Sequence, residues 1–172
     1  MSAIRSIGVV GAGTMGNGIA QVFAQAGFNV YLQDTVLDAL DRARTTIEAS
    51  LARLVSKNIL HKDERDRTLE RLSTVRDLGA FSEVDYIVEA IIEDTDTKKR
   101  LFTALDSLVG SSVILASNTS SISISTLAAT TARPDRVLGM HFMNPAPLMP
   151  LVELVKGQHT SQETMAAAVA LC

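Results

Sequence analysis

The sequence predicts a doubly wound α/β fold with a mostly parallel sheet, and three observations support this prediction. Short apolar runs alternate along the 172 residues with longer segments whose apolar residues recur every three or four positions. Glycines separate the first apolar run from the amphipathic segment that follows it. Polar side chains come directly after several apolar runs, where ligands bind in sheets of this kind.

The first apolar run, residues 4–10, ends in three glycines with the spacing G-x-G-x-x-G, which are Gly11, Gly13 and Gly16. We expect a strand, a tight turn and a helix that continues to Ala26. Gly11 permits the turn, Gly13 lets a pyrophosphate approach the backbone, and Gly16 lets the helix pack close to the strand. The free N–H groups of the first helical turn, where Thr14 and Met15 lie, would then face the phosphates. This pattern predicts a dinucleotide-binding Rossmann domain.

The second predicted strand, residues 28–32, is followed by Asp34, which lies 18 positions after Gly16. A carboxylate at this place can bind both ribose hydroxyls of an adenosine. It would also repel a 2′-phosphate, so the sequence predicts NAD rather than NADP as the cofactor. The alternative is that Asp34 only caps the helix that follows it.

The remaining pattern predicts further strands at 73–76, 84–91, 112–117, 136–142 and 151–156, and helices at 36–57, 62–72, 95–109 and 161–172. The helices at 36–57 and 62–72 form an excursion after the second strand that is longer than an ordinary crossover needs. Its basic residues form either a solvated face or a docking surface for an anionic ligand; they are Arg53, Lys57, Lys62 and Arg65.

Composition limits the other function classes. With 47% hydrophobic residues, residues 1–172 can bury the core of one domain. A net charge of −3 without a basic stripe argues against nucleic acid as a partner, and no apolar run approaches the roughly 20 residues that span a bilayer. A strand begins almost at the N-terminus and Cys172 is the single cysteine, so we expect a cytoplasmic protein without a targeting peptide.

His141 ends a predicted strand, and Glu153 lies twelve residues later on the returning strand. A strand–loop–strand return can bring the two side chains together, so that the carboxylate fixes the imidazole tautomer and stabilises the imidazolium. The pair would then act as a general base. The alternative is a structural histidine. A metal site is not expected, because His61 and His159 lie in other regions and thiols do not cluster.

The segment 117–121 is polar where a strand leaves the sheet. It is either an ordinary turn with a helix cap, or a set of donors for a substrate oxygen and the nicotinamide ribose. A nucleophilic serine is disfavoured, because no G-x-S-x-G motif surrounds it.

Several motifs resemble the NAD-binding domain of the 3-hydroxyacyl-CoA dehydrogenases, which include bacterial 3-hydroxybutyryl-CoA dehydrogenases of fatty acid metabolism. They are GAGTMGNGIA at 11–20, VEAIIED at 88–94, ASNTSSISI at 116–124 and GMHFMNPAPLMPLVELV at 139–155, together with Asp34. The resemblance extends through nearly the whole chain, and its last two motifs are far more specific than the glycine motif.

The resemblance implies a role for each matching residue. His141 would take the proton of the 3-hydroxyl group, Glu153 would orient it, and Ser120 would bond the reacting oxygen. Asn118 would lie against the nicotinamide, and Glu93 and Lys98 would be further NAD contacts. The substrate would be an acyl-CoA, held in part by the helical excursion.

The family continues into a P-G-F-x-x-N-R motif with a catalytic asparagine and into a helical C-terminal domain that dimerises. The present sequence has neither. We therefore expect a fragment, rather than a domain that has lost these parts, of an enzyme that is a homodimer at full length. The sheet of such a fragment would expose an apolar edge. A non-catalytic dinucleotide-binding module and a dehydrogenase of a free hydroxy acid remain the alternatives.

Overall fold

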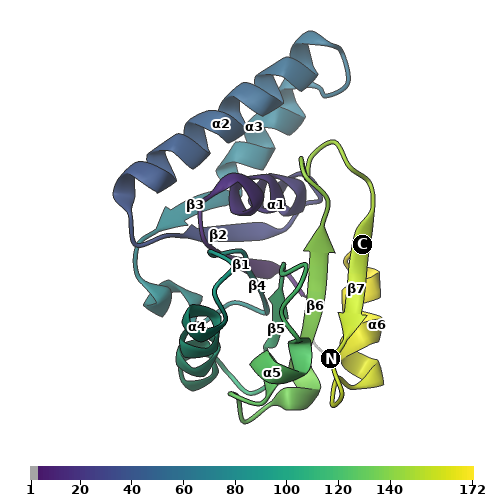
Figure 1. The fold of residues 1–172 in the computed structure, drawn as a ribbon. Coiled ribbons are helices and arrows are strands. Elements are labelled where there is room, and N and C mark those ends of the chain that lie inside the picture. The colour runs from purple at the N-terminus through teal and green to yellow at the C-terminus, as the bar shows by residue number, and fades with distance from the viewer. Residues whose placement is uncertain (1–3) are drawn as a thin grey trace.

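The computed structural model describes residues 4–172 and shows an α/β sandwich, so residues 1–3 of the expected domain lie outside the described residues (Figure 1). Within that range the strands are β1 (Ser6–Val10), β2 (Asn29–Gln33), β3 (Leu72–Val75), β4 (Tyr86–Glu89), β5 (Ile114–Ser117), β6 (Val137–Phe142) and β7 (Val152–Lys156). The helices are α1 (Thr14–Gln25), α2 (Leu37–Ser56), α3 (Lys62–Glu70), α4 (Thr95–Leu108), α5 (Ile124–Ala128) and α6 (Gln162–Ala170).

The described strands form one sheet in the order β3-β2-β1-β4-β5-β6-β7. Strands β1 to β6 run parallel, and β7 pairs antiparallel with β6. The predicted doubly wound, mostly parallel sheet is therefore confirmed. The strand order reverses between β1 and β4, and ligands of such sheets bind at the carboxyl ends of the strands beside that reversal.

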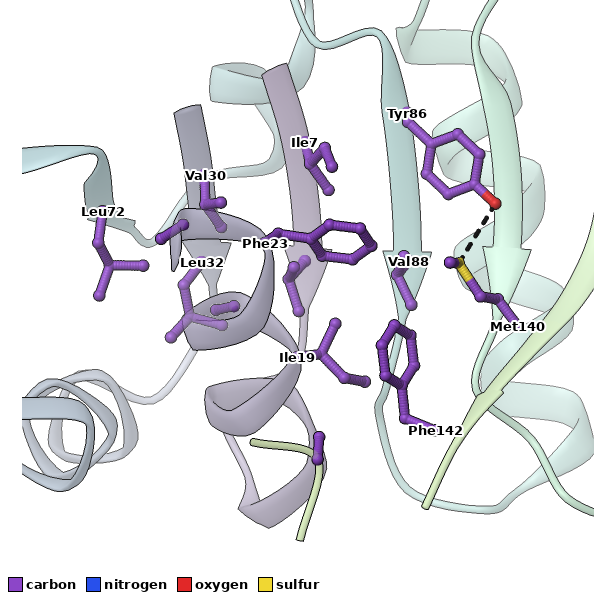
Figure 2. Close-up of a cluster of buried hydrophobic side chains, with 14 of the residues drawn as sticks. Ile7, Ile19, Phe23, Val30, Leu32, Leu72, Tyr86, Val88, Met140 and Phe142 are labelled. Carbon is purple, nitrogen blue, oxygen red and sulfur yellow. Dashed lines mark hydrogen bonds between the residues drawn. The ribbon is translucent and has the colours of Figure 1, made fainter. Parts of the chain in front are cut away.

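Helices cover both faces of the sheet (Figure 1). On one face, α1, α2, α3 and α6 pack over a large apolar cluster, part of which Figure 2 shows. On the other face, α4 and α5 cover a second cluster that includes Phe102, Leu105 and Leu127. Apolar side chains on both sides of β1 and β4 explain why these strands read as continuous apolar runs.

The sequence predicts most element boundaries to within two residues, because the ending signals act locally. Gly27 adopts a positive φ of 101° directly after the last turn of α1, and Asn58 does the same after α2 with a φ of 56°. The Ser161 hydroxyl caps α6 by accepting a hydrogen bond from the Thr164 N–H. The short helix α5 was not predicted, since a five-residue helix in a Ser/Thr-rich segment shows no apolar period.

The described sheet ends in an exposed apolar edge, as the sequence predicts. On β7 the side chain of Val155 is 44% exposed, and Leu151 just before the strand is 55% exposed. Val169 of α6 is 61% exposed. These exposed side chains are available for packing against further protein.

Candidate active site

The glycine-rich turn between β1 and α1 is built as the spacing predicts. Gly11 has a φ of 98°, and its N–H donates to the Gln33 carbonyl at 2.8 Å. A Cβ on Gly16 would lie 1.7 Å from the Gly11 carbonyl oxygen, so only glycine fits there. A Cβ on Gly13 would meet no atom of the described chain within 4 Å. The space in front of the first turn of α1 is thus open, as a bound pyrophosphate requires.

Asp34 joins this turn to the end of β2. Its Oδ2 accepts a hydrogen bond from the Ala12 N–H at 2.9 Å, and its Oδ1 accepts one from the Val36 N–H at 2.9 Å. Val36, not Asp34, is the N-cap of α2. Asp34 also lines a cavity of about 440 Å³ that extends from Gly11 to Arg76 and Leu101.

A second cavity, of about 340 Å³, lies at the carboxyl ends of β4, β5 and β6. The sequence predicts most of the polar side chains in its wall, and the fold brings them together from separate loops. The predicted residues that line it are Met15, Glu93, Lys98, Asn118, Ser120 and His141. The basic residues of α2 and α3 line neither of these two cavities.

His141 and Glu153 face each other across β6 and β7. They are direct partners in the antiparallel register, and His141 Nδ1 lies 2.9 Å from Glu153 Oε2. The histidine side chain is 22% exposed and that of the glutamate is 53% exposed. When Nδ1 carries the proton it donates to the carboxylate, which leaves the Nε2 lone pair as the acceptor for a substrate proton.

The residue after His141 anchors the end of β6 in the core. The Phe142 ring packs edge-to-face on Phe23 of α1, with centroids 5.8 Å apart (Figure 2). The Phe142 N–H donates to Asn118 Oδ1 at 2.9 Å, and the Asn118 N–H donates to the Glu89 carbonyl at 2.8 Å. Asn118 therefore links the ends of β4, β5 and β6 beside the histidine, in addition to lining the cavity.

A buried polar network lies behind the cavity, and sequence reasoning found only part of it. Glu89 and Ser117 are fully buried at the ends of β4 and β5, and Lys98 of α4 is 1% exposed. Lys98 Nζ donates to Glu89 Oε1 and lies 3.2 Å from Glu93 Oε2. The Ser117 hydroxyl donates to Glu89 Oε2 at 2.6 Å. The sequence does contain a signal for this network. Glu89 and Ser117 each end an apolar run, and a polar side chain buried at such a position needs a hydrogen-bond partner.

Glu93 is held as a carboxylate by its neighbours. Partial burial alone would raise its pKa, but the Thr119 hydroxyl, the Lys98 charge and the Ser121 hydroxyl together lower it below the usual value. Ser121 Oγ donates to Glu93 Oε1 at 3.0 Å, and the Thr119 hydroxyl donates to the same oxygen. The cavity wall thus carries the Glu93 carboxylate beside the Lys98 ammonium group.

Comparison with known proteins shows which family this chain belongs to. Residues 6–172 match the family model of the 3-hydroxyacyl-CoA dehydrogenase NAD-binding domain. The chain belongs to this family. The cofactor of this NAD-binding domain is accordingly NAD, which agrees with the open glycine turn and with a carboxylate at position 34.

Among the relatives of this chain are 3-hydroxybutyryl-CoA dehydrogenases. The protein of that name from Bradyrhizobium diazoefficiens is 43% identical over 97% of this chain and 57% of its own length. That from Clostridioides difficile is 42% identical over 92% of this chain and 56% of its own. The crystal structure of (S)-3-hydroxybutyryl-CoA dehydrogenase from Ralstonia eutropha superposes with a TM-score of 0.96 at 46% identity, covering 98% of this chain and 60% of the other. The chain therefore spans a little over half the length of these relatives.

In residues 4–172 of the chain, every helix is too short or too polar to cross a membrane.

Proposed function

We propose that this chain is the cofactor-binding part of an NAD-dependent dehydrogenase that interconverts a 3-hydroxyacyl-CoA and a 3-oxoacyl-CoA, with 3-hydroxybutyryl-CoA as the preferred substrate. The observation that carries the proposal is the His141–Glu153 contact of 2.9 Å at the wall of a cavity that also contains Ser120 and Asn118. A domain that only bound a dinucleotide would have no need of a histidine held by a carboxylate.

His141 performs the proton step. Its Nε2 accepts the hydrogen bond of the substrate hydroxyl and takes the proton as the C3–H bond breaks. The Glu153 carboxylate stabilises the imidazolium that forms. Ser120, which is exposed in the same cavity, donates to the reacting oxygen and keeps it beside the histidine. NAD, held at the glycine-rich turn and Asp34, would supply the hydride acceptor for the oxidation and the hydride donor for the reverse reaction.

One end of the site binds the pyrophosphate and the adenosine ribose. The pyrophosphate lies at the glycine-rich turn and the first turn of α1, which contain Gly11, Gly13, Thr14, Met15 and Gly16, and the ribose lies at Asp34. Glu93, Lys98 and Asn118 lie at the other end, where the nicotinamide must lie to face a carbon bonded to the oxygen at His141. This division agrees with the two cavities, which lie on either side of the glycine turn.

Oxidation of NADH in the presence of acetoacetyl-CoA, followed by absorbance, tests the proposed reaction. We expect turnover with acetoacetyl-CoA and NADH, and little with NADPH or with free acetoacetate. Turnover of acetoacetate at an equal rate would instead identify a dehydrogenase of free hydroxy acids. Fluorescence titration of the same sample with NADH separates a binding domain that needs further chain for turnover from a protein without the cofactor site.

The exposed apolar side chains of β7 and α6 support a second part of the proposal, that the full-length protein is a homodimer. Exposed apolar side chains of this kind are places where further protein commonly packs. Light scattering of the full-length protein should give twice the mass of one chain, and a monomer would contradict this part alone.

A further inference from the structure

The buried network behind the nicotinamide cavity has more negative than positive groups. Its charged members are Glu89, Lys98 and Glu93, which we name the charge trio. Glu89 and Lys98 are 0% and 1% exposed, so water does not screen them as it screens a surface pair. Two carboxylates share one ammonium group, and the trio therefore carries one uncompensated negative charge.

The contacts of Glu89 are those of an anion. Its Oε1 accepts from Lys98 Nζ and from the Ile91 N–H at 2.8 Å, and its Oε2 accepts from the Ser117 hydroxyl at 2.6 Å. All three partners donate, so both carboxylate oxygens of Glu89 act as hydrogen-bond acceptors. Lys98 Nζ is similarly surrounded by acceptors, since the Ile91 carbonyl lies 3.4 Å away in addition to the two glutamates.

The trio borders the place where the cofactor changes its charge. Glu93 and Lys98 line the cavity that contains His141, and Glu89 lies directly behind Lys98. Hydride transfer requires the nicotinamide ring within about 3.5 Å of the reacting carbon, and hence in this cavity. The ring is cationic in NAD⁺ and neutral in NADH, so a nearby fixed charge stabilises the two forms unequally.

We propose that the charge trio sets the balance between oxidised and reduced cofactor, with Glu89 as the positioning residue that pairs with Lys98 and thereby leaves the charge of Glu93 uncompensated at the cavity. The proposal rests on the proposed function, because that function places the nicotinamide ring in this cavity. Through its excess carboxylate the trio favours NAD⁺ over NADH. Lys98 influences the nicotinamide ring through its charge, because its ammonium group contacts Glu89, Glu93 and the Ile91 carbonyl.

The test is the ratio of the dissociation constants of NAD⁺ and NADH, each measured by titration calorimetry without substrate. Glu89→Gln removes the charge and keeps the shape, since the amide oxygen can accept from Lys98 and the amide nitrogen can donate to Ser117. We expect the ratio Kd(NAD⁺)/Kd(NADH) to rise about tenfold in this variant. Ser117→Ala is the matched control, because it removes a hydrogen bond to Glu89 without removing charge, and its ratio should equal that of the wild type.

Equal changes of both dissociation constants in Glu89→Gln would overturn the proposal and leave only a structural role for Glu89. If Glu89→Gln does not fold, Glu93→Gln removes the same charge at the partly exposed end of the trio and should raise the ratio in the same direction. An unchanged ratio there would also overturn the proposal. A wild-type protein that binds neither dinucleotide would contradict the proposed function itself, which makes the two failures distinguishable.

Discussion

At the scale of the residue, the site depends on carboxylates whose oxygens are held by particular partners. Asp34 is an example, because one of its oxygens fastens the glycine-rich turn through the Ala12 N–H and the other fastens the start of α2. The same carboxylate lines the cavity of about 440 Å³ that we propose for the adenosine. It therefore shapes the cavity and gives it a charge that a 2′-phosphate would oppose.

Replacing Asp34 by alanine tests this role. We expect NADH binding to weaken and the preference for NADH over NADPH to fall by about tenfold or more, because the repulsion of the 2′-phosphate is lost. Fluorescence titration with both dinucleotides measures the preference. Asp38→Ala, which removes an exposed carboxylate in the first turn of α2, should leave the preference unchanged. An unchanged preference in Asp34→Ala would remove this residue from the cofactor site.

Sequence reasoning identifies His141 and Glu153 together because a strand that returns after a loop brings positions near its start back beside the first strand. It does not identify Glu89 and Ser117 as partners. Their contact depends on the β4–β5 register, in which Glu89 pairs with Ser117, and an apolar pattern does not fix that register. For the same reason the bond from the Phe142 N–H to Asn118 has no signal in the sequence.

At the scale of the element, two glycines of one motif have different physical tasks. Gly16 lies inside α1 against the Gly11 carbonyl, whereas Gly13 is the N-cap of the helix and faces open space. The φ of Gly13 is −69°, which alanine also adopts. Gly16 is thus needed for folding of the turn, and Gly13 is needed to leave space in front of the helix.

Alanine at each position separates these tasks. The free energy of unfolding of Gly13→Ala should stay within about 1 kcal/mol of the wild-type value. The variant should nevertheless bind NADH at least about tenfold more weakly, because the added methyl group occupies the space for the pyrophosphate. Gly16→Ala should lower the free energy of unfolding by about 3 kcal/mol or more through the clash with Gly11. Thermal unfolding and NADH titration of both variants measure the two effects. Unimpaired NADH binding by folded Gly13→Ala would place the pyrophosphate elsewhere.

At the scale of the whole molecule, the two halves of the sheet meet between β1 and β4, and they are fastened at the end away from the site. Asp85, just before β4, accepts hydrogen bonds at its Oδ2 from the Arg5 N–H at 2.8 Å and from the Ser6 N–H and hydroxyl at 2.9 Å. Burial opposes the charge, but these bonds and the charge of Arg5 together lower the pKa of Asp85. The ionised carboxylate therefore stabilises the native sheet.

Because the pKa of Asp85 is lower in the folded than in the unfolded chain, its contribution is present above the unfolded value of about 4 and disappears as the pH falls through the folded value. We expect Asp85→Asn to lower the free energy of unfolding at pH 7 by about 1 kcal/mol, a modest effect at a partly exposed site. The difference from the wild type should shrink below about pH 4. Urea unfolding at several pH values measures it, and a difference that persists undiminished in acid would exclude this explanation.

The sequence also predicts the architecture as a whole, since alternating apolar runs and amphipathic segments leave few sheet topologies open. The single-domain boundary at 1–172 and the individual roles of the site residues stay predictions. They depend on ligands and on chain outside residues 4–172, which no pattern within these residues determines.

The most direct test of the central claim is NADH oxidation with acetoacetyl-CoA by the wild type and by His141→Gln, with NADH binding titrated on the same samples. If the histidine held by Glu153 is the base, turnover falls at least about a hundredfold in the variant while its dissociation constant for NADH stays within about twofold. Turnover that survives the substitution, or a loss of NADH binding as large as the loss of turnover, would contradict the account.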